Sequence, residues 1–327
     1  MNNELEDRPG GPRHSAKISP RRGSRFWPAL ALSVAALLMP PAFAAEAPAP
    51  GPLCFTAESD GAAVGMEAVG PDAPKVALEV SRDGQTWEAW QEPRTAKLAG
   101  KGDKLYVRAA APNAAFGKGS VFAPHQHSYN HFTVTGKVAA SGNVMSLLDR
   151  DGAAMVALAD GNAPQRDSAF MKLFSGCAGL TAAPELPATK LTSDCYAGMF
   201  EGCAGLTAAP KLPATELADA CYGLMFADCT GLLAAPQLPA TVLAHSCYSK
   251  MFHRCAGLAT APDLPATDLA KGCYLGMFLG CRGLTAAPCL PATKLQNHCY
   301  FMMFKDCFSL ATAPELPSTE LEDGCYA

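Results

Sequence analysis

The sequence predicts an α/β repeat fold, in which a solenoid follows a small antiparallel β-domain of sandwich type. The first observation is a Leu-Pro-Ala-Thr core that starts at Leu186 and recurs every 26 residues, without insertion or deletion, ending as Leu-Pro-Ser-Thr at Leu316. The second is an apolar stripe at helical spacing within each unit, and the third is a series of strand and turn patterns before residue 150. Self-similarity at a fixed period is typical of solenoids, whose units bury their apolar faces only by stacking.

Each 26-residue unit has two halves with different patterns. The first half carries Pro184 and Pro187. Because proline has no N–H to donate, any strand there is short, about three residues. The second half has apolar residues at i, i+4 and i+8, at Cys195, Met199 and Cys203. This spacing predicts a helix of about two turns, which persists only by stacking on neighbouring units.

The chain divides into five segments by composition. The first is typical of an export signal, because Arg21, Arg22 and Arg25 precede an apolar run that ends before Ala42-Phe43-Ala44. That run, about 13 residues, is shorter than the ~20 that a membrane anchor needs, so we expect cleavage near Ala44. The predicted segments are a signal peptide at 1–44, a linker at 45–52, a β-rich domain at 53–150, a junction and N-cap at 151–168, and the repeats at 169–327.

The β-rich domain is predicted from alternating, β-prone runs. Residues 76–80 and 86–90 flank Asp83-Gly84, a strong hairpin signal because glycine adopts the positive φ of a type I′ turn. Further strands are expected at 104–109 and 131–138. At the other end of the chain, the sequence stops midway through a unit, at Cys325-Tyr326-Ala327, so we expect the polypeptide to continue.

The sequence indicates no cofactor, no metal and no catalytic site. His125, His127 and His131 are weak candidates for a zinc site, since residues two apart on a strand share a face. No acidic or thiol ligand lies in that segment, which favours a polar surface loop. No Ser/His/Asp, paired-carboxylate or phosphate-loop arrangement is present, so the chain is predicted not to be an enzyme. The net charge of −4 argues against nucleic acid as a partner.

Twelve of the 14 cysteines fall into two columns of the repeat. We interpret them as buried free thiols that act as small apolar residues. A disulfide ladder within a column stays possible, because an exported protein is oxidised and stacked strands lie ~4.8 Å apart. Cys54 and Cys289 lie outside both columns, and Cys289 occupies a position expected to be exposed. The columns are Cys195, Cys221, Cys247, Cys273, Cys299 and Cys325, and Cys177, Cys203, Cys229, Cys255, Cys281 and Cys307.

Two columns vary from unit to unit and are therefore the candidate binding face. We name the first the after-proline column and the second the after-threonine column. Both mix charge signs, so either a solvated surface or a ligand surface fits the pattern. The after-proline column is Glu185, Lys211, Gln237, Asp263, Cys289 and Glu315, and the after-threonine column is Lys190, Glu216, Val242, Asp268, Lys294 and Glu320.

The repeats resemble those of the BspA-like leucine-rich-repeat surface proteins of bacteria, through their Leu-Pro-Ala-Thr cores, Cys-Tyr pairs and Met-Phe-x-x-Cys runs. The segment 81–87 is similar to part of the β-domain that precedes such repeats. The resemblance implies a leucine-rich-repeat right-handed solenoid with a concave strand face. It also implies export to the cell surface or medium and a role in adhesion. The unit here is longer than the family's common one, and alanine and proline stand where its strands carry isoleucine or valine.

The leading functional hypothesis is an exported, non-enzymatic protein that binds a host or neighbouring-cell protein or glycan through the repeat face. We expect no membrane span after removal of the signal. One alternative is a structural spacer that displays a further module. Another is the binding portion of a secreted enzyme whose catalytic domain lies elsewhere. Because the varying columns mark a surface but name no ligand, the sequence leaves the partner's identity open.

Overall fold

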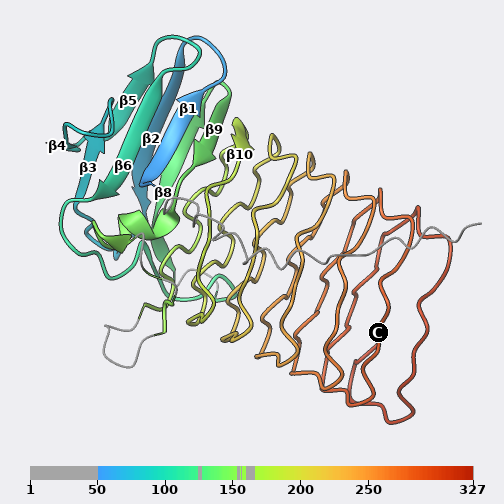
Figure 1. The fold of residues 1–327 in the computed structure, drawn as a ribbon. Helices are drawn as coiled ribbons and strands as arrows, with labels where there is room; N and C mark the ends of the chain where they lie inside the picture. The colour runs from blue at the N-terminus through green and yellow to red at the C-terminus, as the bar shows by residue number, and fades with distance from the viewer. Residues whose placement is uncertain (1–50, 124–126, 153–154, 156, 160–165, 327) are drawn as a thin grey trace, which may run out of the picture. The chain divides into compact units, whose positions relative to one another are not determined.

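The computed structural model describes residues 51–123, 127–152, 155, 157–159 and 166–326. Residues 48–327 form one compact unit. The predicted signal peptide and His125 lie outside the described residues. Two β-sheets come first, and the repeats follow as a series of coils that lie side by side (Figure 1). Among the described residues, no helix is long and apolar enough to span a membrane.

The two sheets are mainly antiparallel and share a hydrophobic core. The six-stranded sheet has the order β10-β9-β1-β6-β3-β4 and the four-stranded sheet the order β5-β2-β8-β7. Phe55 of β1 and Phe132 of β8 meet with ring centroids 4.9 Å apart, which joins the two sheets. The strands are β1 (Leu53–Ala57), β2 (Ala62–Val69), β3 (Leu78–Ser81), β4 (Glu88–Ala89), β5 (Thr95–Leu98), β6 (Lys104–Ala109), β7 (Gly117–Lys118), β8 (Ser128–Thr135), β9 (Val138–Ser141) and β10 (Leu180–Ala182).

Some strands follow the sequence pattern closely. β6 spans the predicted range, and its inward side chains Leu105 and Val107 are buried, as alternation requires. β3 and β4 form the predicted antiparallel hairpin around Gly84, whose φ is 75°. The Asp83 carboxylate accepts hydrogen bonds from the N–H groups of Thr86 and Gln85. These bonds hold the pKa of Asp83 well below its usual range and fix the loop.

The predicted α/β leucine-rich-repeat solenoid is wrong. The described residues contain no α-helix, and their only helical segment is the 3₁₀ turn η1, Val144–Leu147, which precedes the repeats. The segment 195–203, predicted to be a two-turn helix, is instead a run of consecutive turns. Strand content in the repeats is also low, because β10 is followed only by isolated parallel bridges such as Ala208↔Ala234. The architecture is therefore two open sheets followed by turn-rich coils.

Backbone hydrogen bonds explain why no helix forms. We call the 26-residue segments 169–194, 195–220, 221–246, 247–272, 273–298 and 299–324 rungs 1 to 6. In rung 2 the N–H of Met199 donates to the carbonyl of Tyr196, three residues back, at 3.2 Å. Tyr196 and Gly198 instead donate to Cys221 and Gly223 of rung 3, at 3.0 and 2.8 Å. A helix would use every N–H internally, whereas these residues use alternate ones to join rungs.

Left-handed residues repeat every four positions in this half of each rung. Asp194, the last residue of rung 1, and Gly198 and Gly202 of rung 2 have φ values of 52°, 60° and 75°. Ala220, the last residue of rung 2, and Leu224 of rung 3 lie 26 residues after Asp194 and Gly198 and also have positive φ. A left-handed residue ends a helical turn, so the chain closes one turn and begins the next. The i, i+4, i+8 spacing of apolar side chains follows this four-residue period and not the 3.6-residue period of a helix.

Identical side chains stack from rung to rung. The tyrosine rings from Tyr196 to Tyr326 lie 5.7–5.9 Å apart, within 9° of parallel. The phenylalanine rings from Phe174 to Phe304 are spaced at 5.4–5.8 Å. The thiol of Cys229 donates to the carbonyl of Phe200 at 3.0 Å, and the other cysteines of that column do the same. Stacking therefore accounts for the columns that do not vary.

The β-domain continues these columns and provides the first layer of the stack. The ring of Phe132 in β8 lies 5.2 Å from that of Phe174, at the head of the phenylalanine column. Phe116, which precedes β7, stacks on Phe170 at 6.3 Å, at the head of the tyrosine column. The N–H of Phe116 donates to the carbonyl of Ala169 at 2.7 Å, just as each rung donates to the carbonyls of the next rung. The apolar face of rung 1 is thus covered by the β-domain.

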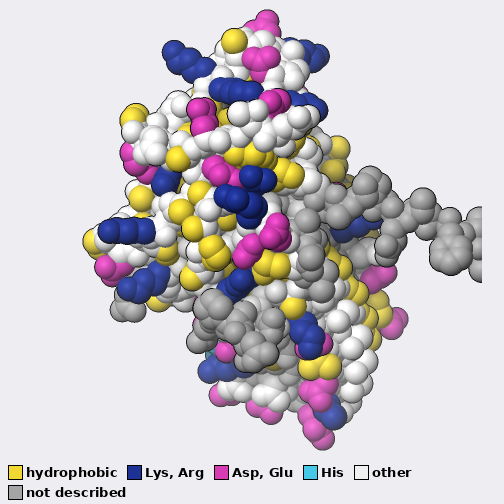
Figure 2. Space-filling view, turned by 60° about the vertical axis from the view of Figure 1, so that its left-hand side comes forward, with side chains coloured by type: hydrophobic (Ala, Val, Ile, Leu, Met, Phe, Trp, Pro, Cys, Tyr) yellow, Lys and Arg dark blue, Asp and Glu magenta, His cyan; other side chains and the backbone are white. Residues whose placement is uncertain are grey.

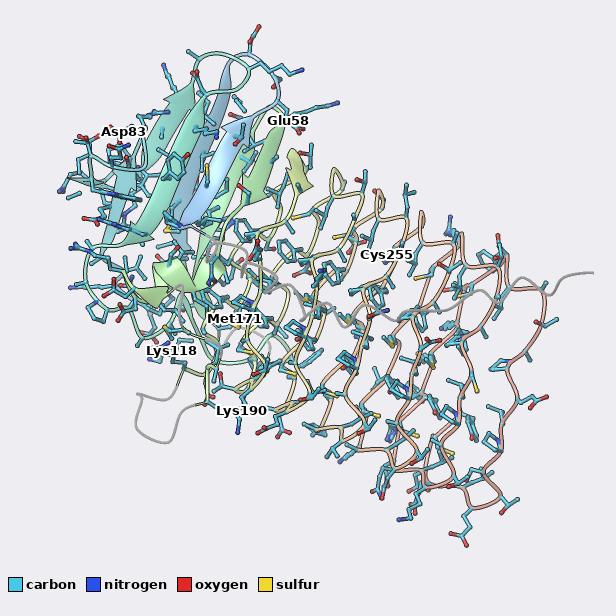
Figure 3. All side chains as sticks on the ribbon, viewed as in Figure 1. Glu58, Asp83, Lys118, Met171, Lys190 and Cys255 are labelled. Carbon is cyan, nitrogen blue, oxygen red and sulfur yellow. The ribbon has the colours of Figure 1, made fainter. Side chains whose placement is uncertain are left out.

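Close packing marks the same junction. Met171 of rung 1, which is labelled in Figure 3, packs against Gly117 of β7. A Cβ atom on Gly117 would be 2.8 Å from the Met171 Cβ, a distance that packed atoms do not adopt. Glycine is therefore required where the β-domain approaches the first rung.

Removing one buried hydroxyl should stabilise the protein. The hydroxyl of Tyr248 is buried and has no hydrogen-bond partner among the described residues. An unsatisfied buried hydroxyl costs about 1–3 kcal/mol, and Phe170 shows that a phenyl ring fits this column. We expect Tyr248→Phe to raise the free energy of unfolding by about 1 kcal/mol in urea denaturation. Tyr222→Phe is the matched control, because its hydroxyl is not among the buried unpartnered atoms. A loss of stability in Tyr248→Phe larger than in the control would contradict this prediction.

Candidate binding surface

All twelve residues of the candidate binding face are exposed. They fall in the two predicted columns, one residue of each column in every rung. The neighbouring positions in the same segment, such as Leu186 and Ala188, are buried at 3% and 0% exposure. The side chains that vary between rungs are therefore exposed, and the invariant ones beside them fill the core.

Shallow grooves walled by proline accompany the after-proline column. The groove between rungs 1 and 2 has a volume of about 450 Å³ and holds Glu185 and Lys211. The next groove, of about 490 Å³, holds Lys211 and Gln237. A third, of about 560 Å³, holds Cys289 and Glu315. Four prolines wall each groove, so the surface offers rigid apolar rings around one or two polar side chains.

The prolines also leave backbone groups free for a ligand. Proline cannot donate to a ladder, so adjacent rungs do not pair along this segment. The N–H of Glu185 donates to Gly142 at 2.8 Å. The N–H groups of Lys211, Gln237 and Asp263 have no hydrogen-bond partner within the described part of the chain. Each groove therefore presents donors as well as apolar walls.

The after-threonine column uses most of its charges internally. Lys190 pairs with Glu216 at 3.0 Å and Lys294 with Asp268 at 3.2 Å, each pair across a parallel bridge between rungs. These side chains remain about half to three-quarters exposed, so each ion pair is worth well under about 1 kcal/mol. Val242 interrupts the column and is 76% exposed. Lys190 lies at the margin of the stack (Figure 3).

The surface carries charges of both signs. On the face shown in Figure 2, lysine and arginine side chains alternate with aspartate and glutamate, with hydrophobic patches between them. No single-sign field covers that face. This agrees with the mixed columns, and it offers a polyanion no continuous basic track.

All 14 cysteines are free in the structure, and Cys289 is the exposed one. The cysteines of both columns are the buried free thiols that the sequence favoured, and not the alternative disulfide ladder. Burial raises the pKa of the Cys195 and Cys229 thiols to about 12, so these groups stay protonated and unreactive at neutral pH. Protonation is also what lets a thiol donate to a carbonyl. Cys289 lies in the third proline groove, where sequence variation predicted an exposed position.

Two of the three histidine candidates, His127 and His131, are described, and each lies beside a backbone carbonyl. The Nδ1 atom of His131 lies 3.1 Å from the Ser175 carbonyl, and that of His127 lies 3.4 Å from the Ala123 carbonyl. His125 is outside the described residues. No group of His, Cys, Asp or Glu among the described residues could hold a metal ion.

One serine–histidine contact occurs in rung 3. Ser246 Oγ lies 3.5 Å from His245 Nε2, the limit of a hydrogen bond. The Asp219 carboxylate accepts from the backbone N–H of His245 and not from its ring. A catalytic triad needs the carboxylate on the imidazole, to orient the ring and stabilise its charge. This contact lacks that arrangement.

A charged hollow lies on another part of the rungs and was not predicted. Its charged residues are Asp228, Arg254, Arg282, Lys305 and Asp306, and its volume is about 450 Å³. The sequence signal for this hollow is a repeat position whose residue type changes from small to charged in a later rung. The position after the Met-Phe cysteine, for example, is alanine or threonine in four successive rungs and becomes arginine at 282.

Comparison of the chain with protein-family models, curated proteins and solved structures found no match. The resemblance to BspA-like surface proteins therefore stays a prediction from the repeat motif.

Proposed function

We propose that the chain is an exported, non-enzymatic binding protein. It contacts a protein or glycan at a cell surface or in the medium through the after-proline and after-threonine columns. The observation that carries the proposal is the arrangement of twelve exposed, varying side chains in fixed register over a core of stacked, invariant ones. A rigid scaffold with variable exposed positions lowers the entropy lost on binding.

The proline grooves suggest how a partner is held. Proline rings offer flat apolar surfaces for the aromatic side chains of a protein or the apolar faces of sugars. The free N–H groups of Lys211, Gln237 and Asp263 can donate to carbonyl or hydroxyl oxygens of the partner. Because the grooves repeat along the stack, an extended partner can occupy several at once, and weak contacts then add.

The proposal is tested on an array of extracellular proteins and glycans, probed with purified residues 45–327. A binding variant carries Lys211→Glu and Gln237→Lys, which change the side chains in two adjacent grooves. The matched control is Lys101→Glu, which changes an exposed lysine of the β-domain outside both columns. We expect at least one saturable ligand, and about tenfold weaker binding by the groove variant only.

Two results would contradict the proposal. Absence of any saturable ligand would favour the spacer hypothesis, in which the stack only displays another module. Binding that both variants leave unchanged would move the contact surface away from these columns.

A further inference from the structure

The charged hollow introduced above lies on the rungs outside both varying columns. It spans rungs 3 to 6 at the end of the turn-rich half. Its floor includes Gly280, whose φ is 77° and which has no side chain to fill the space. A Cβ atom there would be 3.2 Å from Arg254 Cγ. Arg254, Gly280 and Asp306 occupy the same repeat position in rungs 4, 5 and 6. The hollow lies where rung 5 has no side chain at that position.

The cations of the hollow are only partly neutralised by the protein. Arg254 lies 3.8 Å from Asp228, a long and exposed ion pair. Arg282 lies over the ring of Phe308 at 5.7 Å. Neither Arg282 nor Lys305 forms an ion pair with any described residue. Three basic side chains from successive rungs thus line one hollow with spare hydrogen-bond donors, and such donors suit an oxyanion.

The same hollow offers acceptors and a neutral imidazole. Asp306 is exposed and forms no ion pair in the described residues, so its carboxylate is free to accept from hydroxyl groups. His253 also lines the hollow. Burial, and then the charge of Arg254, lower the pKa of His253, so its ring is neutral at pH 7 and can donate or accept. The site therefore combines cations for one anionic group with acceptors for several hydroxyls.

Size and overall charge restrict the ligand further. A volume of about 450 Å³ is within the range of small-molecule sites and suits a single sugar unit. A long polyanion is disfavoured, because the chain has a net charge of −4 and two carboxylates lie in the hollow itself.

We propose that this hollow binds an acidic sugar, with Arg254, Arg282 and Lys305 on its carboxylate, sulfate or phosphate group and Asp306 on its hydroxyls. The hollow shares no residue with the proline grooves, so the two binding proposals are tested separately.

Isothermal titration of residues 45–327 at low ionic strength tests the proposal with four probes, namely glucuronate, glucose 6-sulfate, glucose 6-phosphate and glucose. The three acidic sugars distinguish the source of the anionic group, and glucose is the neutral control. We expect saturable binding of at least one acidic sugar below about 10 mM, weakened by added salt, and none of glucose.

The double variant Arg254→Gln/Arg282→Gln should weaken that binding at least about tenfold. Lys101→Gln, which removes an exposed lysine of the β-domain, should leave it within about twofold. All three positions are exposed, so the variants should fold, and circular dichroism checks this. Failure of every acidic sugar to bind, equal binding of glucose, or an unchanged affinity in the double variant would overturn the proposal.

Discussion

Phe174→Ala should lower the free energy of unfolding by about 3–5 kcal/mol, the largest single effect that we expect. The ring of Phe174 contacts Phe55, Phe132 and Phe200, with centroid distances of 6.2, 5.2 and 5.4 Å. Truncation therefore leaves a cavity where both sheets meet the first rung. Chemical denaturation followed by tyrosine and tryptophan fluorescence measures the loss.

The control for this prediction is Phe308→Ala, because Phe308 is 74% exposed. It should change stability by no more than about 0.5 kcal/mol. A double-mutant cycle with Phe132→Ala should show that the two substitutions are not additive, since their rings touch. A cost below about 1 kcal/mol for Phe174→Ala would contradict the packing described.

Alkaline pH should unfold the protein over a narrow range. The pKa of Cys177, Cys195, Cys229, Cys247 and Cys281 is raised by burial to about 12, from a reference value of 9.0. The folded chain keeps these protons where the unfolded chain releases them, so high pH favours unfolding. Stability is complete below pH 9 and falls above it, by about 1.4 kcal/mol per pH unit for each thiol.

Denaturation curves between pH 7 and pH 11 under reducing conditions measure this slope. Replacing Cys229, Cys255 and Cys281 with alanine should remove the contribution of three thiols from the slope of stability against pH. The same replacement also lowers stability at neutral pH, because these side chains are buried. Stability that stays constant from pH 8 to pH 10.5 would show that the thiols are not buried as described.

Much of the organisation followed from the sequence, and the local structure of the repeat did not. Variation between units located the exposed columns, and alternation located β6. The helix at 195–203 was wrong because apolar residues every four positions resemble a helical stripe. The glycines at 198 and 202 carried the contrary signal, since both have positive φ. Leu224 and Asp228 have positive φ at the equivalent places in rung 3, and these conformations were not predictable from propensity.

Contacts between rungs explain the other differences. The ion pairs within the after-threonine column join residues 26 apart, so they become evident only when rungs stack in register. The charged hollow likewise gathers side chains from four rungs. The cover that the β-domain provides for rung 1 depends on Phe116 and Phe132, which no repeat pattern identifies as members of the aromatic columns.

The packing of Phe132 on Phe174 should make the β-domain and the rungs one cooperative unit. Hydrogen-exchange mass spectrometry that compares the native protein with Phe174→Ala tests this cooperativity. We expect the N–H groups of β8 (Ser128–Thr135) and of residues 195–203 to exchange together, and faster exchange in both segments of the variant. Faster exchange in β8 alone, with residues 195–203 unchanged, would contradict this cooperativity.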